Sequence, residues 1–208
     1  MSIQVALAGN PNCGKTTLFN RITGENGYVG NWPGVTVEKK QAKLLGDKDV
    51  VVTDLPGIYS LSPYSPEEVC SRDYLVNDRP DVVINLVDST NIERSLYLTT
   101  QILELGLPVV IALNMTDLLK KNGDVVDTAK LSDLFGCPVV ECSALRGAGV
   151  DEVIAAAKKA AAAKKAAAPT VKFSDKMEGA LSKIDEIAGA GAPAALKRWY
   201  AVKLFEGD

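Results

Sequence analysis

The sequence contains no histidine, and its four cysteines do not form a C-x-x-C pair. They are Cys13, Cys70, Cys137 and Cys142. Because histidine and paired cysteines are the usual zinc ligands, these absences argue against a zinc site. They also exclude acid–base catalysis by histidine. Cys13 precedes an expected helix, where a thiol pKa can fall. We nevertheless interpret it as a small residue in a tight loop rather than as a redox switch.

Long apolar runs and dense positive charge are also missing. No apolar segment approaches the ~20 residues that cross a bilayer. The formal net charge is -3, and basic residues cluster no further than Lys-Lys pairs, which argues against a nucleic-acid partner. The N-terminus leads directly into an expected strand, without the pattern of a signal peptide. We therefore expect the chain to face the cytosol.

The stretch from Gly9 to Thr16 fits the pattern G-x-x-x-x-G-K-[ST]. An expected strand at 3–8 precedes it, and an expected helix at 17–22 follows. This order predicts a phosphate cradle, in which backbone N–H groups and the helix dipole face phosphate oxygens. Its residues would be Gly9, Asn10, Pro11, Asn12, Cys13, Gly14, Lys15, Thr16 and Thr17. Lys15 would reach the β- and γ-phosphates, and Thr16 would bind Mg²⁺. The alternative is a glycine-containing turn that matches by chance.

Strands alternate with helices along the rest of the chain. Runs of valine and isoleucine predict buried strands, and a more polar run predicts an edge strand. The six expected strands are 3–8, 37–45 (the edge strand), 49–53, 81–88, 108–114 and 138–142. Helices are expected at about 66–76, 92–105, 128–135 and from 150, and long loops at 25–38 and 58–66. Continuous apolar runs indicate an α/β fold with a mostly parallel sheet covered on both faces. Ligands bind such sheets at the carboxyl ends of the strands.

The composition changes at Ala155, where a run of alanine and lysine begins that Pro169 should end. Two amphipathic helices are expected after it. They are too short to bury their apolar faces alone, so they must pack on the preceding part, on another copy of the chain, or on further sequence. We therefore expect a nucleotide-binding domain at 1–165 and a small all-α domain at 166–208.

Two further motifs follow expected strands. In the first, Asp54 would hold Mg²⁺ and the Gly57 N–H would contact the γ-phosphate, with Leu55 and Pro56 between them. In the second, a carboxylate three residues after an amide could accept from the N–H groups of guanine, which adenine lacks. Its residues are Asn114, Met115, Thr116 and Asp117. An Asn-x-x-Asp tetrapeptide alone could equally be a loop or a helix cap.

Two loops should complete the site. Backbone N–H groups of Ser143, Ala144 and Leu145 would close over the base. The mobile loop would contribute Gly34, Val35, Thr36, Val37 and Glu38. Within it, the Thr36 hydroxyl would join Mg²⁺ only when a γ-phosphate is present. Together with Lys15, Asn12 and Gly57, Thr36 is a candidate catalytic residue.

These motifs, in this order, resemble those of GTPases. The runs at 9–20, 30–38, 54–61 and 114–117 are similar to the cytosolic N-terminal region of the bacterial ferrous iron transport protein B family. The resemblance covers Ile3 to about Ala156. It implies a Mg²⁺-dependent GTPase that regulates iron uptake at the cytosolic face of the inner membrane, joined to a membrane pore. It also implies that the helices after Pro169 slow GDP release. The family usually has serine at Cys13 and a helical region that continues beyond Asp208.

Two departures from common GTPases affect the expected chemistry. Met115 replaces a lysine, which predicts fast GDP release and micromolar affinity. Ile58 stands where many GTPases have the glutamine that orients water, so hydrolysis should be slow. Positive charge is also needed to neutralise the charge that develops between the β- and γ-phosphates. An arginine such as Arg72 could supply it, or K⁺ held by Asn12, as in similar GTPases that use potassium. Alternatively, Asn12 only satisfies a turn. Two other functions also fit: a ribosome- or tRNA-associated GTPase, or a nucleotide switch with negligible turnover.

Overall fold

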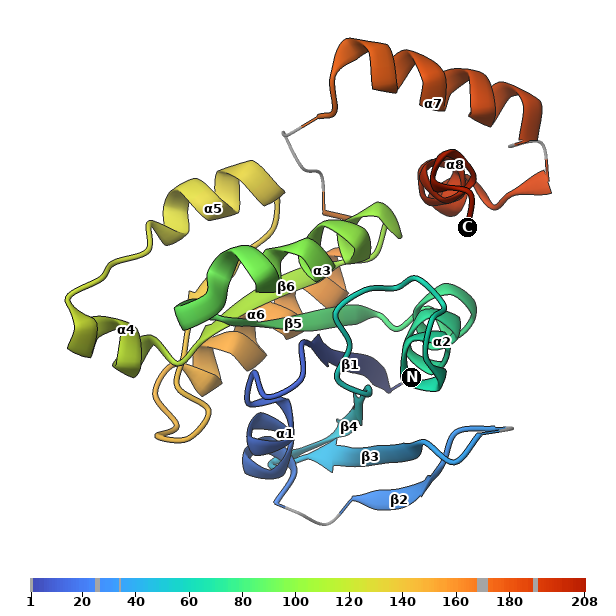
Figure 1. The fold of residues 1–208 in the computed structure, drawn as a ribbon. Coiled ribbons are helices and arrows are strands. Elements are labelled where there is room, and N and C mark those ends of the chain that lie inside the picture. The colour runs from blue at the N-terminus through green and yellow to red at the C-terminus, as the bar shows by residue number, and fades with distance from the viewer. Residues whose placement is uncertain (1, 25–26, 34, 168–171, 189–190) are drawn as a thin grey trace.

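The computed structural model describes residues 2–24, 27–33, 35–167, 172–188 and 191–208. Within them a seven-stranded sheet has the order β2-β3-β4-β1-β5-β6-β7 (Figure 1). The strands are β1 (Ile3–Gly9), β2 (Tyr28–Asn31), β3 (Glu38–Leu44), β4 (Asp47–Asp54), β5 (Val82–Asp88), β6 (Val109–Asn114) and β7 (Val139–Glu141). β4, β1, β5, β6 and β7 run parallel, whereas β2 and β3 pair antiparallel. The predicted α/β class with a mostly parallel sheet is therefore confirmed.

Eight α-helices are described. They are α1 (Lys15–Thr23), α2 (Pro66–Asp73), α3 (Ile92–Glu104), α4 (Thr116–Asn122), α5 (Thr128–Phe135), α6 (Val150–Ala163), α7 (Asp175–Ala188) and α8 (Lys197–Glu206). Shorter turns are the π-helical η1 (Tyr74–Asp78) and the 3-10 helices η2 (Ser89–Asn91) and η4 (Ala194–Leu196). No helix in the described ranges is both long enough and apolar enough to cross a membrane.

The predicted number of six strands was wrong, because β2 lies in a segment predicted to be a loop. Tyr28 to Asn31 pair with Glu38 to Gln41 of β3. Consequently β3 is an interior strand rather than the expected edge. The glycines of this segment indicated a loop, whereas the strand depends on hydrogen bonds with residues about ten positions away.

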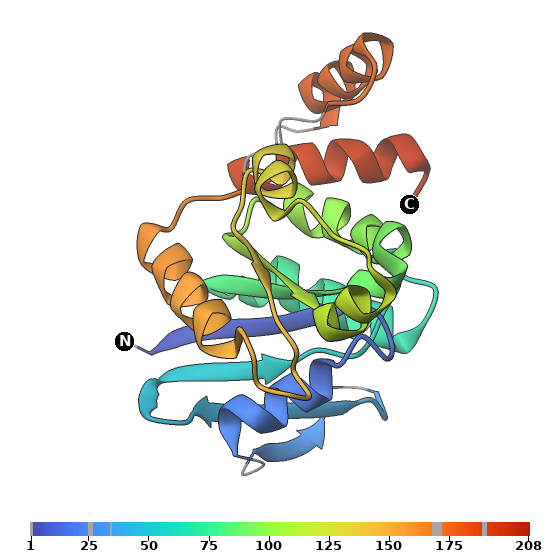
Figure 2. The ribbon, with the colours of Figure 1, turned by 90° about the vertical axis from the view of Figure 1, so that its left-hand side faces the viewer.

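Side chains from the two faces of the sheet form two apolar layers. On β5, Ile84 points into the layer shared with α1 and α6, whereas Val83 and Val87 point into the layer shared with α2 and α3. Figure 2 shows the sheet between these groups of helices. Continuous apolar strands are therefore explained by burial on both faces.

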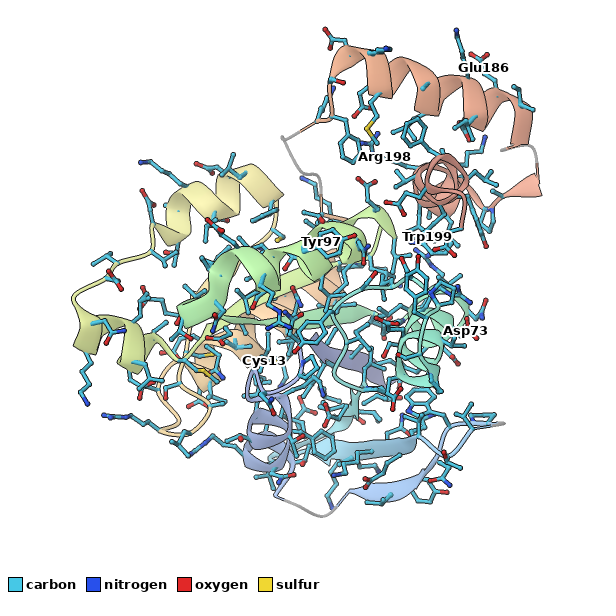
Figure 3. All side chains as sticks on the ribbon, in the orientation of Figure 1. Cys13, Asp73, Tyr97, Glu186, Arg198 and Trp199 are labelled. Carbon is cyan, nitrogen blue, oxygen red and sulfur yellow. The ribbon has the colours of Figure 1, made fainter. Side chains whose placement is uncertain are left out.

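The described residues after the sheet form no separate all-α domain, contrary to the predicted fold class. Trp199 of α8 is only 6% exposed and belongs to the same apolar layer as α3 (Figure 3). Arg198 pairs with Glu104 of α3 at 2.7 Å and with Glu178 of α7 at 2.9 Å. α7 then packs on α8 through Leu181. The division at residue 165 itself stays a prediction, and Pro169 lies outside the described residues.

Candidate functional site

The turn between β1 and α1 forms the wall of an open cleft at the carboxyl end of the sheet. Asn12 and Gly14 adopt left-handed backbone conformations, with φ of 64° and 93°. Such angles turn the chain sharply from the strand into the helix, and asparagine and glycine tolerate them best. The cleft has a volume of about 510 Å³. Its lining residues are Asn10, Pro11, Asn12, Gly14, Lys15, Thr16, Thr17 and Gly57.

Two glycines are required by close packing around this turn. A Cβ on Gly9 would lie 2.7 Å from Cys13 Sγ and 2.8 Å from the Leu86 carbonyl oxygen. A Cβ on Gly57 would lie 3.0 Å from Pro11 Cα. The segment that follows Asp54 therefore approaches the turn closely enough for the Gly57 backbone to line the cleft.

Lys15, Thr16 and Asp54 meet at the cleft, as the motifs predicted. Lys15 Nζ donates to Asp54 Oδ1 at 2.9 Å, and both side chains are buried. Thr16 Oγ1 lies 3.5 Å from the other carboxylate oxygen of Asp54. Mg²⁺ prefers a few protein oxygens completed by phosphate oxygens and water. The hydroxyl of Thr16 and the carboxylate of Asp54 fit that requirement.

The loop that carries Thr36 packs elsewhere. Thr36 is exposed and is not among the described residues that line the cleft. Nearby, the buried Trp32 meets the Tyr74 ring edge-on with centroids 5.4 Å apart. Val35 and Val37 pack on the same apolar layer. Gly34 lies outside the described residues, and Glu38 already belongs to β3.

Asn114 joins two parts of the site instead of standing free in it. Its Nδ2 donates to the Cys13 carbonyl at 2.7 Å, and its Oδ1 accepts from the Ala144 N–H at 2.8 Å. Thr116 Oγ1 donates to the Cys142 carbonyl at 3.1 Å. Both side chains are buried, so the tetrapeptide 114–117 fixes the phosphate turn and the 143–145 loop to each other.

The end of the tetrapeptide faces solvent. Met115 has a φ of 64° and marks the turn between β6 and α4. Asp117 forms an ion pair with Arg146, whose Nε lies 2.9 Å from Asp117 Oδ2. The tetrapeptide 114–117 therefore has two parts. Asn114 and Thr116 are buried and structural, whereas the Asp117 carboxylate is half-buried and already contacts the Arg146 guanidinium.

The 143–145 loop is held by Arg21, a residue that sequence reasoning missed. Arg21 donates to the carbonyls of Ala144 and Leu145 at 2.7 and 2.6 Å. The Ser143 N–H donates to Ala148 and the Ala144 N–H to Asn114, so neither is free for a base as predicted. Basic residues are common in the last turn of a helix. Arg21 therefore could not be recognised from the sequence as a residue that holds the 143–145 loop.

Ile58, after the Gly57 motif, is buried, and its N–H donates to the Gly9 carbonyl at 3.2 Å. Its side chain cannot hydrogen-bond to water. Arg72 is not a cleft residue: it pairs with Asp73 and lines a cavity between α2 and α8. Another arginine, Arg94, contacts a cleft residue: its carbonyl accepts from Asn10 Nδ2 at 3.4 Å, and its guanidinium lies 4.1 Å from the centre of the Tyr59 ring.

Cys13 lies on the buried side of the phosphate turn (Figure 3). Burial raises the pKa of its thiol to about 11, although Lys15 opposes the shift. The reactive thiolate is therefore scarce at neutral pH, which favours the packing interpretation over the redox one.

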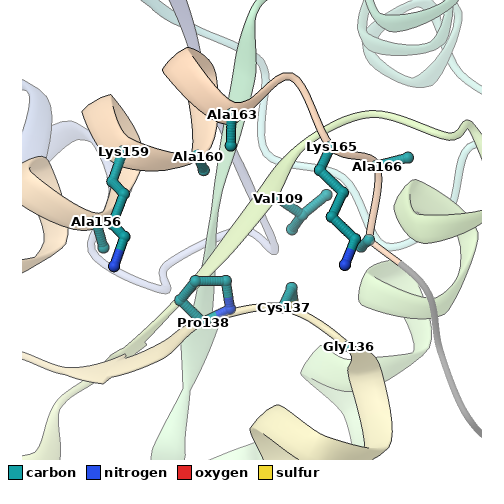
Figure 4. A pocket seen from close by; sticks show the side chains of 11 residues that line it. Val109, Gly136, Cys137, Pro138, Ala156, Lys159, Ala160, Ala163, Lys165 and Ala166 are labelled. Atoms are coloured by element: carbon teal, nitrogen blue, oxygen red, sulfur yellow. The ribbon is translucent and has the colours of Figure 1, made fainter.

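A second hollow of about 360 Å³ lies beside α6 and β6, away from the cleft (Figure 4). Its lining combines the methyl groups of alanines such as Ala156 and Ala160 with the side chains of Lys159 and Lys165. It shares no lining residue with the cleft. The phosphate-turn motif lines the cleft and not this hollow, so the cleft is the candidate site.

The family model for ferrous iron transport protein B matches residues 3–157. This chain belongs to that family. It is 46% identical to an Fe(2+) transport protein A/Fe(2+) transporter FeoB fusion protein of Porphyromonas gingivalis, an alignment that covers 99% of this chain and 25% of that protein. It is 39% identical to the Fe(2+) transporter FeoB of Escherichia coli K12, covering 99% and 27%. The chain thus spans about a quarter of the length of these relatives.

Solved structures of the family share the fold. The crystal structure of NFeoB from S. thermophilus bound to GDP.AlF4⁻ and K⁺ is 51% identical, with a TM-score of 0.90, and the match covers 99% of this chain and 80% of that one. A GDP-bound mutant of the same protein gives a TM-score of 0.92 at 51% identity, covering the same shares. These relatives give no support to the alternative of a ribosome- or tRNA-associated GTPase.

Proposed function

We propose that this chain binds GTP with Mg²⁺ and hydrolyses it to GDP and phosphate. The observation that carries the proposal is the meeting of Lys15, Thr16 and Asp54 at the cleft beside the β1–α1 turn. Relatives in this family are named in complex with GDP and with GDP.AlF4⁻, a mimic of a nucleotide with a γ-phosphate.

Each cleft residue then has a defined task. The backbone N–H groups of the turn and the start of α1 bind the phosphates. Lys15 exchanges the Asp54 carboxylate for phosphate oxygens and neutralises their charge. Thr16 and Asp54 would hold Mg²⁺, which would offset negative charge on the phosphates. The Gly57 N–H faces the γ-phosphate, and Thr36 must move to reach the metal.

Hydrolysis needs positive charge near the β- and γ-phosphates, and Arg72 does not line the cleft. K⁺ would supply that charge. Asn12 is exposed, lines the cleft and has no hydrogen-bond partner among the residues that the structure describes. Its amide oxygen is therefore available to a cation. The S. thermophilus relative is named in complex with K⁺.

The test compares GTP hydrolysis in KCl and NaCl at equal ionic strength. The rate should be higher in KCl, by roughly ten-fold or more if the cation stabilises the transition state. Asn12→Ala should remove the difference while GDP still binds. Asn122→Ala, which removes the same side chain at the exposed end of α4, is the control and should retain it. Equal wild-type rates in both salts would contradict the potassium role, and no hydrolysis in either would indicate a switch without turnover.

The wider role is that of a regulatory part of a ferrous iron uptake transporter. We place this part at the cytosolic face of the bacterial inner membrane, joined to a membrane-embedded pore in the full-length protein. Support comes from the curated relatives, which are Fe(2+) transporters about four times as long as this chain. Iron uptake into cells that carry Lys15→Ala in the full-length protein should fall, and unchanged uptake would contradict the regulatory role.

A further inference from the structure

The carboxylate expected to select guanine is already engaged by a side chain of the protein. Arg146 Nε lies 2.9 Å from Asp117 Oδ2. The Arg146 side chain is 71% exposed, whereas that of Asp117 is 21% exposed. Asp117 is therefore partly enclosed at the end of the tetrapeptide 114–117, and Arg146 reaches it from the neighbouring loop.

We propose that Arg146 is a built-in competitor for the guanine base. The donor edge of guanine is part of a guanidine unit, with a ring N–H and an exocyclic amino group on the same carbon. The guanidinium of Arg146 carries the same kind of N–H donors in a plane, and its Nε forms an ion pair with one oxygen of the same carboxylate. This inference rests on the proposed function, since Asp117 is a base-selecting group only if the chain binds GTP.

Hydrogen bonds hold the backbone on both sides of Arg146. They keep the base of its side chain within reach of Asp117. The Arg146 N–H donates to Ser143 Oγ at 3.3 Å. Immediately before it, the carbonyl of Leu145 accepts from Arg21 of α1. The Gly147 N–H donates to the Ser143 carbonyl at 2.7 Å and closes the turn. The long, exposed side chain can still swing away without disturbing these bonds.

Competition has a direct effect on affinity. If Arg146 occupies Asp117 for part of the time, the apparent dissociation constant of a guanine nucleotide rises by the inverse of the free fraction. An exposed ion pair is weak, so the effect should be only a few-fold. Arg146 would also take over the carboxylate as the base departs, which favours fast GDP release.

The direction in which nucleotide affinity changes when Arg146 is removed distinguishes a competitor from a residue that merely attracts the nucleotide by its charge. Removing a positive charge near a polyanionic nucleotide should weaken binding. Removing a competitor should tighten it. Arg146→Ala should therefore bind a fluorescent GDP analogue roughly two- to five-fold more tightly than wild type, the range for an exposed ion pair. GDP release should slow by a similar factor.

Lys120→Ala is the matched control. Lys120 is 68% exposed, lies on α4 close to Asp117 in sequence, and pairs with Glu141 at 2.8 Å instead. Lys120→Ala removes one positive charge, as Arg146→Ala does, but does not free Asp117. Binding of the GDP analogue should therefore be unchanged or weaker. Raising KCl should bring wild type and Arg146→Ala together, because salt screens the ion pair.

The outcomes can be told apart. Tighter binding in Arg146→Ala but not in Lys120→Ala supports the competitor role. Equal or weaker binding in Arg146→Ala, with wild type still binding GDP, overturns it and leaves the proposed function intact. If the wild type binds no guanine nucleotide, the proposed function fails and this inference fails with it.

Discussion

At the scale of single residues, the proposed function makes Asp117 the group that selects the base. Its carboxylate can accept from guanine but cannot donate to the corresponding oxygen of xanthine. Asp117→Asn should weaken GTP binding by about 10- to 100-fold, the equivalent of the ~1–3 kcal/mol of a paired base contact. The same variant should bind xanthosine triphosphate better than wild type. Equilibrium titration of both nucleotides, with ATP as a further comparison, measures this. Wild-type protein that binds ATP as well as GTP would show that the tetrapeptide 114–117 does not select the base.

The predicted residues that the structure brings together at the cleft are those with a local sequence signature. Lys15 and Thr16 follow a glycine turn at a strand–helix junction, and Asp54 ends the next parallel strand. The bridging role of Asn114 and the pairing of Arg146 with Asp117 could not be predicted in this way. They depend on how loops from distant strands meet, which no spacing in the sequence encodes.

At the scale of elements, the loop from Trp32 to Val37 is the part whose position must change for the proposed reaction. The Trp32 N–H donates to the Val37 carbonyl at 2.9 Å, which closes the loop on itself. Lys39 Nζ lies 4.6 Å from the centre of the Trp32 ring. Moving Thr36 to a metal at the cleft should therefore disturb the packing of Trp32.

A GTP analogue should shift Trp32 emission to longer wavelength, because the ring leaves its buried contact with Tyr74. The measurement uses a Trp199→Phe background, so that Trp32 is the only tryptophan. Thr36→Ala in that background should bind the analogue without the shift. An unchanged spectrum with the analogue bound would contradict a nucleotide-sensitive loop.

Most elements agree with the sequence pattern, and the exceptions have a common cause. Apolar runs predicted β4, β5, β6 and β7, and the signal is strongest for β5 and β6, whose residues are almost all buried. β2 and α4 were not predicted. β2 lies in the polar segment predicted to be a loop, and α4 begins inside the tetrapeptide 114–117. At such places the pairing partner or the turn geometry decides the structure, rather than local hydrophobicity.

At the scale of the whole molecule, the C-terminal helices are bound to the part that contains the cleft. Lys203 of α8 is buried and donates to Ser62 Oγ at 3.1 Å, in the segment that follows Gly57. Burial alone would lower the pKa of Lys203, but the carboxylates of Glu206 and Asp208 outweigh it and raise the pKa. The charged amine thus stays in place at neutral pH and joins α8 to a segment beside the cleft.

This attachment predicts that the described helices unfold together with the sheet. Trp199 fills a buried position in the layer that also contains α3, so Trp199→Ala should lower the free energy of unfolding by about 3–5 kcal/mol. Ile187→Ala, at a side chain of α7 that is 85% exposed, is the control and should change it by less than ~0.5 kcal/mol. Denaturant unfolding followed by circular dichroism and by tryptophan emission, which comes from Trp32 alone in Trp199→Ala, should give coincident single transitions for both variants. Two separate transitions, with only the helical one moved by Trp199→Ala, would instead show that 166–208 behave as an independent domain.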